Sequence, residues 1–382
     1  MLCGLHFPGL RGEQRGHRPG AGRETMNILG IGSVFSRGAG VPALEDALLS
    51  GWQAPSRVED PRAESGFRPA YLVDLAAVPD RTLLKKLRRA DKLSKMCVLA
   101  AAGALADSAI PDLADKRIGI ILATAFGAQV TTFDFLDGIL DFGDAHASPT
   151  TFSNSVHNAA ASYVSSSLNI QGPTLTVTQF RFSFQSALQL ARTWLDQGRC
   201  DYLLVGGADQ YGDVLGYVAD RKLHTAGDGR ITPFVFNPAR QVPGEGALFL
   251  LLGRETTENA YCAMDGVYVS DDPARDRAVD MNIIEADGML ADESGYLSSL
   301  DPRIPTTAYS PLFGSMLVGG AFNLAAGALM LKRQTSFAPP VTDNPRGLKL
   351  VAGTAAASIA SIRSLGLNCY GEASAVYLTR LP

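Results

Sequence analysis

Cysteine and histidine are scarce in this sequence, and their placement excludes several kinds of site. The five cysteines, at positions 3, 97, 200, 262 and 369, form no CxxC pair and no metal-ligand spacing. This pattern is typical of a reducing compartment, so we expect a cytoplasmic protein with no zinc site and no bound cofactor. The five histidines all precede residue 225, which leaves the second part of the chain without any.

Charge and long apolar runs are also limited. Charged residues make up 19% of the 382 residues and the net charge is −4, which argues against a nucleic-acid partner. The longest apolar run, 316–331, is interrupted by Asn323 and is shorter than the ~20 residues that a bilayer requires, so we expect no membrane span. The apolar fraction of 46% is instead sufficient for a large buried core.

The first 25 residues lack both periodicity and a sustained apolar segment. They are rich in Gly and Arg, and a signal peptide is not expected there. A strand-like run, MNILGIGSVFS, begins at Met26. We therefore expect residues 1–25 to be a disordered or spurious extension, and the sequence leaves open whether translation starts at Met1 or Met26.

Apolar strand-like runs alternate with helical ones over the rest of the chain. Helices are expected at 92–109 and 182–198. Strands are expected at 117–124, 174–178, 201–209, 246–255, 261–272, 347–356 and 374–381. The succession of strand, helix and strand between 174 and 209 predicts a parallel arrangement with both faces of the sheet covered. The charged segment RETTENA at 254–260 suggests two halves, 26–257 and 258–382.

Four stretches, in order, resemble the β-ketoacyl synthases of the thiolase fold. They are RRADKLSKMCVLAAAGALADSAI at 88–110, the strand–elbow–helix–GGAD segment at 169–209, TPFVFNPARQVPGEGALFLLL at 232–252 and SPLFGSMLVGGAFNLAAGALML at 310–331. The resemblance implies a duplicated α/β fold with α/β/α/β/α layers and mixed, largely parallel sheets. It also implies an acyltransferase chemistry in which an elbow Cys and two His act on acyl-carrier substrates.

A residue-by-residue comparison with the family shows that this chain lacks the Cys and both His that the chemistry requires. Arg181 stands in the place of the Cys, Asp287 in the place of the first His, and Ser315 in the place of the second. The family's Lys falls on Ser310. Because no histidine follows residue 224, no shift of register can supply the missing imidazoles.

Arg181 cannot be a nucleophile, because a guanidinium stays protonated. It is interpreted either as a plug or fixed charge, or as a buried and satisfied ion pair. A buried charge needs a partner, and the position of Asp287 makes it the expected one, with Glu245 as the runner-up.

Other polar residues have ordinary structural explanations beside functional ones. Gln179 fits a strand end, and Ser183 fits the first turn of a helix rather than a substitute nucleophile. His157 is expected to be hydrogen-bonded under a pocket rather than to transfer protons. Cys97 and Cys200 are expected to be packing residues.

Together these features indicate a catalytically incomplete subunit, similar to the chain-length factors of polyketide systems. The resemblance implies a heterodimer with an active ketosynthase, formed along 174–178, and contact with an acyl carrier protein. Phe180, Phe182 and Phe184 are expected at the interface or pocket wall. The basic run 81–96 offers Lys85, Lys86, Arg88 and Arg89 to an acidic carrier, or is simply a solvated face. A stand-alone acyltransferase or condensing enzyme with an unrecognised site, and a homodimeric scaffold, remain alternatives.

Overall fold

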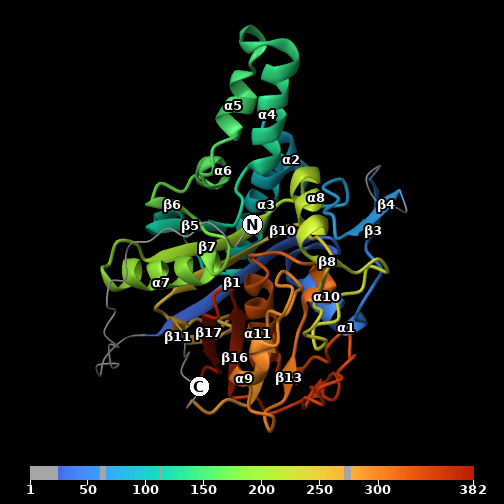
Figure 1. Ribbon diagram of the computed structural model, residues 1–382. Coiled ribbons are helices and arrows are strands. Elements are labelled where there is room, and N and C mark those ends of the chain that lie inside the picture. Colours follow the sequence, from blue (N-terminus) through green and yellow to red (C-terminus); the bar gives the residue numbers. More distant parts are fainter. Residues whose placement is uncertain (1–24, 61–65, 112, 271–276) are drawn as a thin grey trace.

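A computed structural model describes residues 25–60, 66–111, 113–270 and 277–382, so most of the predicted extension lies outside the described residues. The strands of the first half lie above those of the second half in Figure 1. The first half contains β1 (Met26–Phe35), β2 (Gly38–Ala39), β3 (Ser56–Glu59), β4 (Phe67–Ala70), β5 (Ile118–Thr124), β6 (Thr174–Thr178), β7 (Tyr202–Asp209), β8 (His224–Thr225), β9 (Arg240–Gln241) and β10 (Gly246–Gly253). The second half contains β11 (Cys262–Ser270), β12 (Met281–Ile284), β13 (Thr306–Thr307), β14 (Thr335–Ser336), β15 (Ala355–Ala356), β16 (Ser361–Leu367) and β17 (Ala373–Thr379).

Helices connect these strands and cover the sheet. Those of the first half are α1 (Gly40–Ser50), α2 (Arg81–Lys86), α3 (Lys92–Ser108), η1 (Leu113–Asp115), α4 (Gln129–Phe142), η2 (Asp144–His146), α5 (Pro149–Asn154), α6 (Ala159–Ser167), α7 (Ser183–Asp196) and α8 (Asp213–Lys222). Those of the second half are α9 (Gly295–Ser299), α10 (Ser310–Phe313) and α11 (Gly320–Arg333). None of the helices in the described ranges is long and apolar enough to cross a membrane.

The two halves repeat one strand order. The sheet runs β6–β5–β7–β10–β1 in the first half and β13–β12–β16–β17–β11 in the second. If the five strands that each half contributes to this order are numbered along the chain, both halves have the order third, second, fourth, fifth, first. The halves meet where β1 and β11 pair antiparallel, from Met26 opposite Met264 to Ile28 opposite Cys262. The repeated order is the duplication that the resemblance implies, whereas the boundary at 257/258 stays a prediction within the link between β10 and β11.

The sheet is mixed, as expected, but it is not largely parallel. Within this sheet, parallel pairing in the described residues is limited to β5 with β6 and β7, and to β12 with β13 and β16. The central pairs of β1, β7, β10, β11, β16 and β17 are antiparallel. The sequence shows covering helices between some strands but not the direction in which the later, closely spaced strands return.

Side-chain alternation separates the hydrophobic cores on the two sheet faces. On β10, Leu248, Leu250 and Leu252 point into the core shared with α7 and α11, whereas Phe249 and Leu251 point to the core under α3. A third core covers the outer face of the second half around Tyr296 and Tyr377. Helices therefore lie outside and between the two parts of the sheet, in the expected layered arrangement.

One predicted strand is wrong. The segment 347–356 makes only an isolated bridge, Thr306 to Leu350, and the two-residue β15. β17 instead pairs with β11 on one side and with β16 on the other, where Ile362 lies opposite Leu378. The sequence SIRSLGL hides this strand because Arg363 lies inside it, 4% exposed, with its Nε 2.9 Å from Oδ1 of Asn282.

Candidate functional site

The elbow between β6 and α7 positions the first site residue. β6 ends at Thr178, and α7 begins at Ser183. Phe182, at the N-cap of α7, has φ +65° and is 2% exposed, so a bulky residue occupies the left-handed region at the turn. This sharp turn directs Arg181 inward, where its side chain is 9% exposed.

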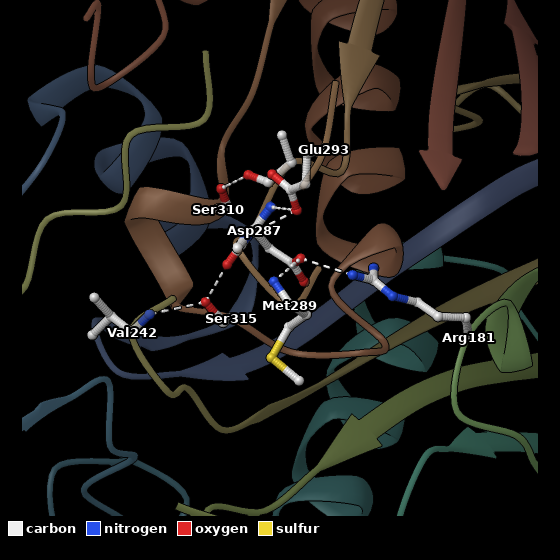
Figure 2. Close-up of polar contacts among 9 residues, drawn as sticks. Arg181, Val242, Asp287, Met289, Glu293, Ser310 and Ser315 are labelled. Carbon is white, nitrogen blue, oxygen red and sulfur yellow. Dashed lines mark hydrogen bonds and ion pairs between the residues drawn. The ribbon is translucent and has the colours of Figure 1, made fainter. Parts of the chain in front are cut away.

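Arg181 meets the loop that follows β12. Its Nη2 lies 3.1 Å from Oδ1 of Asp287, whose side chain is 6% exposed (Figure 2). The same Oδ1 accepts a hydrogen bond of 3.1 Å from the backbone N–H of Met289. The ion pair that the sequence predicts is therefore present in the structure, and it joins the elbow of one half to a loop of the other.

Two further buried carboxyl groups surround this pair. Oε1 of Glu293 accepts from the backbone N–H of Gly288 at 2.9 Å and of Asp287 at 3.3 Å. Oε1 of Glu285 accepts from Nε2 of Gln185 at 2.9 Å. Sequence reasoning missed Gln185 and Glu293, and the polar run ADES at 291–294 gives no sign that Glu293 is buried.

Burial and mutual repulsion set the ionisation of these groups. Burial raises the pKa of Glu285 to about 7, with Arg181 opposing the rise. Burial, and then the charge of Asp287, raise the pKa of Glu293 to about 8. Burial also raises the pKa of Asp287 against the pull of Arg181. Burial disfavours the charge of Arg181, but Asp287 and the other acidic groups outweigh it, and the net pKa of Arg181 is raised.

Ser315 and Ser310 have structural hydrogen bonds rather than free hydroxyl groups. The Ser315 hydroxyl donates to the carbonyl O of Asp287 and accepts from the backbone N–H of Val242 at 3.0 Å (Figure 2). The Ser310 hydroxyl donates to the carbonyl O of Ala286 at 2.6 Å. Gly314 makes this approach possible, because it has φ +87° and an added Cβ would lie 2.7 Å from Cα of Gly244.

Glu245, the runner-up partner of Arg181, lies elsewhere. It forms an ion pair with Lys92, and its carboxylate accepts from the backbone N–H groups of Val73 at 2.8 Å and Tyr211 at 3.2 Å. Its three donors come from different segments of the first half. Glu245 therefore stabilises that half and does not pair with the elbow.

The phenylalanines near Arg181 have different environments. Phe182 and Phe184 are 2% and 1% exposed inside the chain's own core, so neither offers a surface to a partner. Phe180 is half exposed and meets Phe126 edge-on, with ring centroids 5.4 Å apart. Only Phe180 of the three keeps the position expected of an interface residue.

The remaining candidates are divided between the surface and the core. Gln179 is exposed at the end of β6, where its Oε1 accepts from the Ser186 hydroxyl at 3.2 Å. His157 is exposed too, in a surface pocket with Asn158 and Thr174, so its expected place under a pocket is wrong. Lys85, Lys86, Arg88 and Arg89 are exposed on α2 and the turn after it.

Substitute nucleophiles find little support in the described residues. Ser183 is fully buried, and its hydroxyl has no hydrogen-bond partner there. Burial raises the pKa of the Cys97 and Cys200 thiols, which disfavours their reactive thiolates. Within the described ranges, no group of His, Cys, Asp and Glu side chains could hold a metal ion.

A cavity of about 80 Å³ lies beside the site, under α8. Leu215, Ala219, Met289 and Met316 are among the residues that line it, and the Asp209 carboxyl and the Ser315 residue border it. Burial raises the pKa of Asp209 to about 6. Arg181 and Phe182 do not line the cavity.

One family profile matches more than half of the chain. The profile described as beta-ketoacyl synthase, N-terminal domain, matches residues 23–258. A hybrid PKS-NRPS synthetase from Pyricularia oryzae is 29% identical over 212 residues, which is 49% of this chain and 12% of that protein. The chain thus spans a small part of the length of this curated relative.

Solved structures show the same fold over nearly the whole chain. The ishigamide ketosynthase/chain length factor superposes with a TM-score of 0.77 at 18% identity, covering 94% of this chain and 100% of that one. A type II PKS acyl-carrier protein in complex with its ketosynthase gives a TM-score of 0.77 at 16% identity, with the same coverage of both chains.

Proposed function

Because the chain belongs to the β-ketoacyl synthase family, we propose that it is a catalytically incomplete member of that family. In this proposal it is a subunit of the chain-length-factor type, present in the cytoplasm. It pairs with an active ketosynthase in fatty acid, polyene or polyketide-type biosynthesis. The partner supplies the nucleophilic cysteine, and this chain helps to shape the pocket that holds the growing acyl group.

The buried ion pair between Arg181 and Asp287 carries the proposal. Condensation in this family needs a thiolate at the elbow and two imidazoles facing it. A guanidinium can neither attack a thioester nor accept a proton, and Asp287 is held by Arg181 and by the Met289 N–H. Ser315 is bound on both sides, by Val242 and Asp287. The positions that would perform the chemistry therefore hold the two halves together.

The edge of the sheet supports pairing with another subunit. β6 is the outermost strand of the sheet on the side of the first half, and its only strand partner among the described residues is β5. Leu175, on this strand, is 41% exposed. An uncovered edge strand presents free N–H and C=O groups that favour pairing with a strand of another chain.

The exposed basic residues on and after α2 are proposed to contact the acyl carrier protein. Lys85, Lys86, Arg88 and Arg89 are solvent-accessible and lie close together in sequence. Opposite charges steer such encounters and respond to salt. Reversing all four charges to Glu should weaken carrier binding to the heterodimer, while a single Glu258→Lys change elsewhere should leave it unchanged.

A direct test compares the isolated chain with the co-expressed pair. The chain alone, incubated with acyl-loaded carrier protein, should gain no acyl mass. Co-expressed with the ketosynthase subunit encoded nearest to it, the chain should give a one-to-one complex in native mass spectrometry. Acyl transfer to the isolated chain that persists after Ser183→Ala and after all Cys→Ala changes would contradict the proposal, and would favour a stand-alone acyltransferase with another nucleophile.

A further inference from the structure

The cavity under α8 is bordered by two acceptor atoms that lack donors. Oδ2 of Asp209 and Oε1 of Gln241 are buried and accept no hydrogen bond within the described residues, and both residues line the cavity. Asp209 is 5% exposed and Gln241 is fully buried. A buried polar atom without a partner is costly. The cavity is the space beside them from which a donor can come.

The other oxygen of Asp209 fixes the position of its carboxyl group. Oδ1 accepts from the Thr124 hydroxyl and from the backbone N–H of Ala125, both at 2.9 Å. Burial raises the pKa of Asp209 to about 6, although the nearby N–H groups of Ala125, Phe126 and Val318 favour the charged form. None of the ion pairs among the described residues involves Asp209. At neutral pH the chain therefore buries a carboxylate that has no cation beside it.

A chain of hydrogen bonds fixes the orientation of the Gln241 amide. Its Nε2 donates to the Thr225 hydroxyl at 2.7 Å, and that hydroxyl donates to Oδ1 of Asp220 at 2.6 Å. Because the single O–H of Thr225 already donates to Asp220, it can only accept from Gln241. The amide nitrogen is therefore used, and Oε1 is the atom left for another donor.

The remaining walls of the cavity are mainly apolar. They include Leu215, Val218, Ala219, Phe126, Met289 and Met316. Among the described residues that line the cavity, none is Lys or Arg. Asp209 would repel an anion, and a hard metal cation prefers a shell of oxygen atoms that such walls do not provide. An organic cation with a short apolar body matches both the carboxylate and the walls.

Polar contacts hold α8 over this space. Arg68 of β4 is 3% exposed and pairs with Asp60 and with Asp220 of α8, where Nη2 of Arg68 lies 2.5 Å from Oδ2 of Asp220. Gly216 allows the close approach, because a Cβ added there would lie 2.3 Å from Nη1 of Arg68. Ala219, on the side of α8 that lines the cavity, is only partly buried. The ion pair can therefore fix the helix while the space beneath it stays open.

We propose that the cavity under α8 binds a small organic cation, a primary alkylammonium with a short apolar chain. The ammonium group donates to Oδ2 of Asp209 and Oε1 of Gln241, and the alkyl chain contacts the apolar walls beside α8. A primary ammonium carries three donors and a positive charge, so it supplies the missing hydrogen bonds and the missing counter-charge together. A neutral alcohol supplies a donor without the charge. This inference goes beyond the proposed pairing with a ketosynthase and does not depend on it.

The test titrates the isolated full chain with probes that share one carbon skeleton. Butylammonium, butan-1-ol and butyrate differ only in their polar group. Ligand-detected NMR measures each affinity, and the melting temperature gives a second readout, since a ligand that binds the folded state raises it. Butylammonium should bind most tightly, butan-1-ol should bind more weakly, and butyrate should not bind.

Two variants and two matched controls locate the site. Asp209→Asn removes the charge, while its amide oxygen can still accept the hydrogen bonds that Oδ1 accepts now. Ala219→Leu fills the cavity from α8. Asp137→Asn and Ala106→Leu make the same two changes at exposed positions. Asp209→Asn should weaken butylammonium binding by about 10-fold or more with little effect on butan-1-ol, whereas Ala219→Leu should weaken both. The controls should bind as the original chain does.

Several results would overturn the proposal. Equal affinity of butylammonium for the original chain and for Asp209→Asn would show that the carboxylate does not hold the cation. Butan-1-ol binding as tightly as butylammonium would remove the role of the charge, and no binding of any probe would assign the cavity to water. If Asp209→Asn does not fold, Ala219→Leu decides, because unchanged butylammonium binding in that variant would place the ligand elsewhere. None of these results bears on complex formation with a ketosynthase.

Discussion

Nη2 of Arg181 and Oδ1 of Asp287 lie 3.1 Å apart although 106 residues separate them in the sequence. Both side chains are more than nine-tenths buried. The pair therefore links the elbow of the first half to the loop after β12 in the second. Its stability follows the rules for a buried ion pair, in which losing one partner costs more than losing both.

Arg181→Met should destabilise the protein strongly. The substitution leaves Asp287 buried without its cation, and breaking such a pair costs about 3–5 kcal/mol of unfolding free energy. Denaturant unfolding measures this loss. Arg181→Met combined with Asp287→Leu should be less destabilised than the sum of the two single changes.

A surface ion pair provides the control for this effect. Arg117 and Asp201 lie 2.7 Å apart in a solvent-exposed position. Arg117→Met should cause a much smaller loss than Arg181→Met, since water screens the surface pair. Equal losses at the two sites would show that the Arg181 pair is not desolvated.

Stability should fall as the pH rises through neutrality because of Glu293. The pKa of this carboxyl is raised to about 8 in the folded chain, against an ordinary value near ~4.3. Between these values the folded state retains a proton that the unfolded chain has lost, so unfolding becomes easier with rising pH. The contribution is greatest at low pH, decreases from about pH 5 to pH 8, and levels off above.

Glu293→Gln should flatten that pH dependence. The amide imitates the protonated carboxyl and can still accept from the Gly288 N–H. The stability of the variant relative to the original chain should therefore increase as the pH rises from 5 to 9. The measurement is the melting temperature in buffers of equal ionic strength. Glu258 is exposed on the surface, so the melting temperature of Glu258→Gln should change with pH in the same way as that of the original chain. Parallel curves for Glu293→Gln would mean that Glu293 is already ionised in the folded state.

Ser315→Ala should destabilise the protein through a lost acceptor. The backbone N–H of Val242 would be left buried without its partner at 3.0 Å, at a cost of about 1–3 kcal/mol. Ser298 provides the control: its exposed hydroxyl donates to the carbonyl O of Gly295 at 2.8 Å. Ser298→Ala should stay within ~0.5 kcal/mol of the original chain. Similar values for the two variants would contradict the bridging role of Ser315.

Ala109→Gly should stabilise the protein. Ala109 ends α3 with φ +50°, a left-handed conformation that costs an L-residue about 1–2 kcal/mol and that glycine adopts freely. A higher melting temperature is expected. Ala106→Gly changes a residue of the same helix three positions earlier, where the conformation is helical. It should lower the melting temperature, because glycine is a poorer helix former than alanine.

The elbow and its ion pair could be predicted from the sequence because each follows from a simple rule. An apolar strand followed by an amphipathic helix predicts the turn at 179–182, and a cation at a buried turn requires an anion. Residue-by-residue resemblance then selects Asp287 over Glu245. The structure agrees on both points, and it gives Glu245 to Lys92 instead.

Other parts of the site could not be predicted because loop geometry creates them. Glu293 is buried only because the chain turns at Gly288, with φ +76°, and folds its backbone N–H groups onto the Glu293 carboxyl. Strand β16 was missed because a buried Arg363 interrupts its apolar pattern. Phe180 is exposed whereas Phe182 is buried, and the backbone turns between them with a positive φ at Phe182. The spacing of apolar residues in the sequence does not predict this turn.

The repeated strand order makes the second half an internal reference for the first. The second and third strands of the first half, β5 and β6, are joined by residues 125–173. Their counterparts β12 and β13 are joined by residues 285–305, less than half that length, and that shorter connection contains only the small helix α9. The same parallel pairing is therefore reached through a much shorter connection. A chain with a short linker in place of residues 129–156 should still assemble both parts of the sheet.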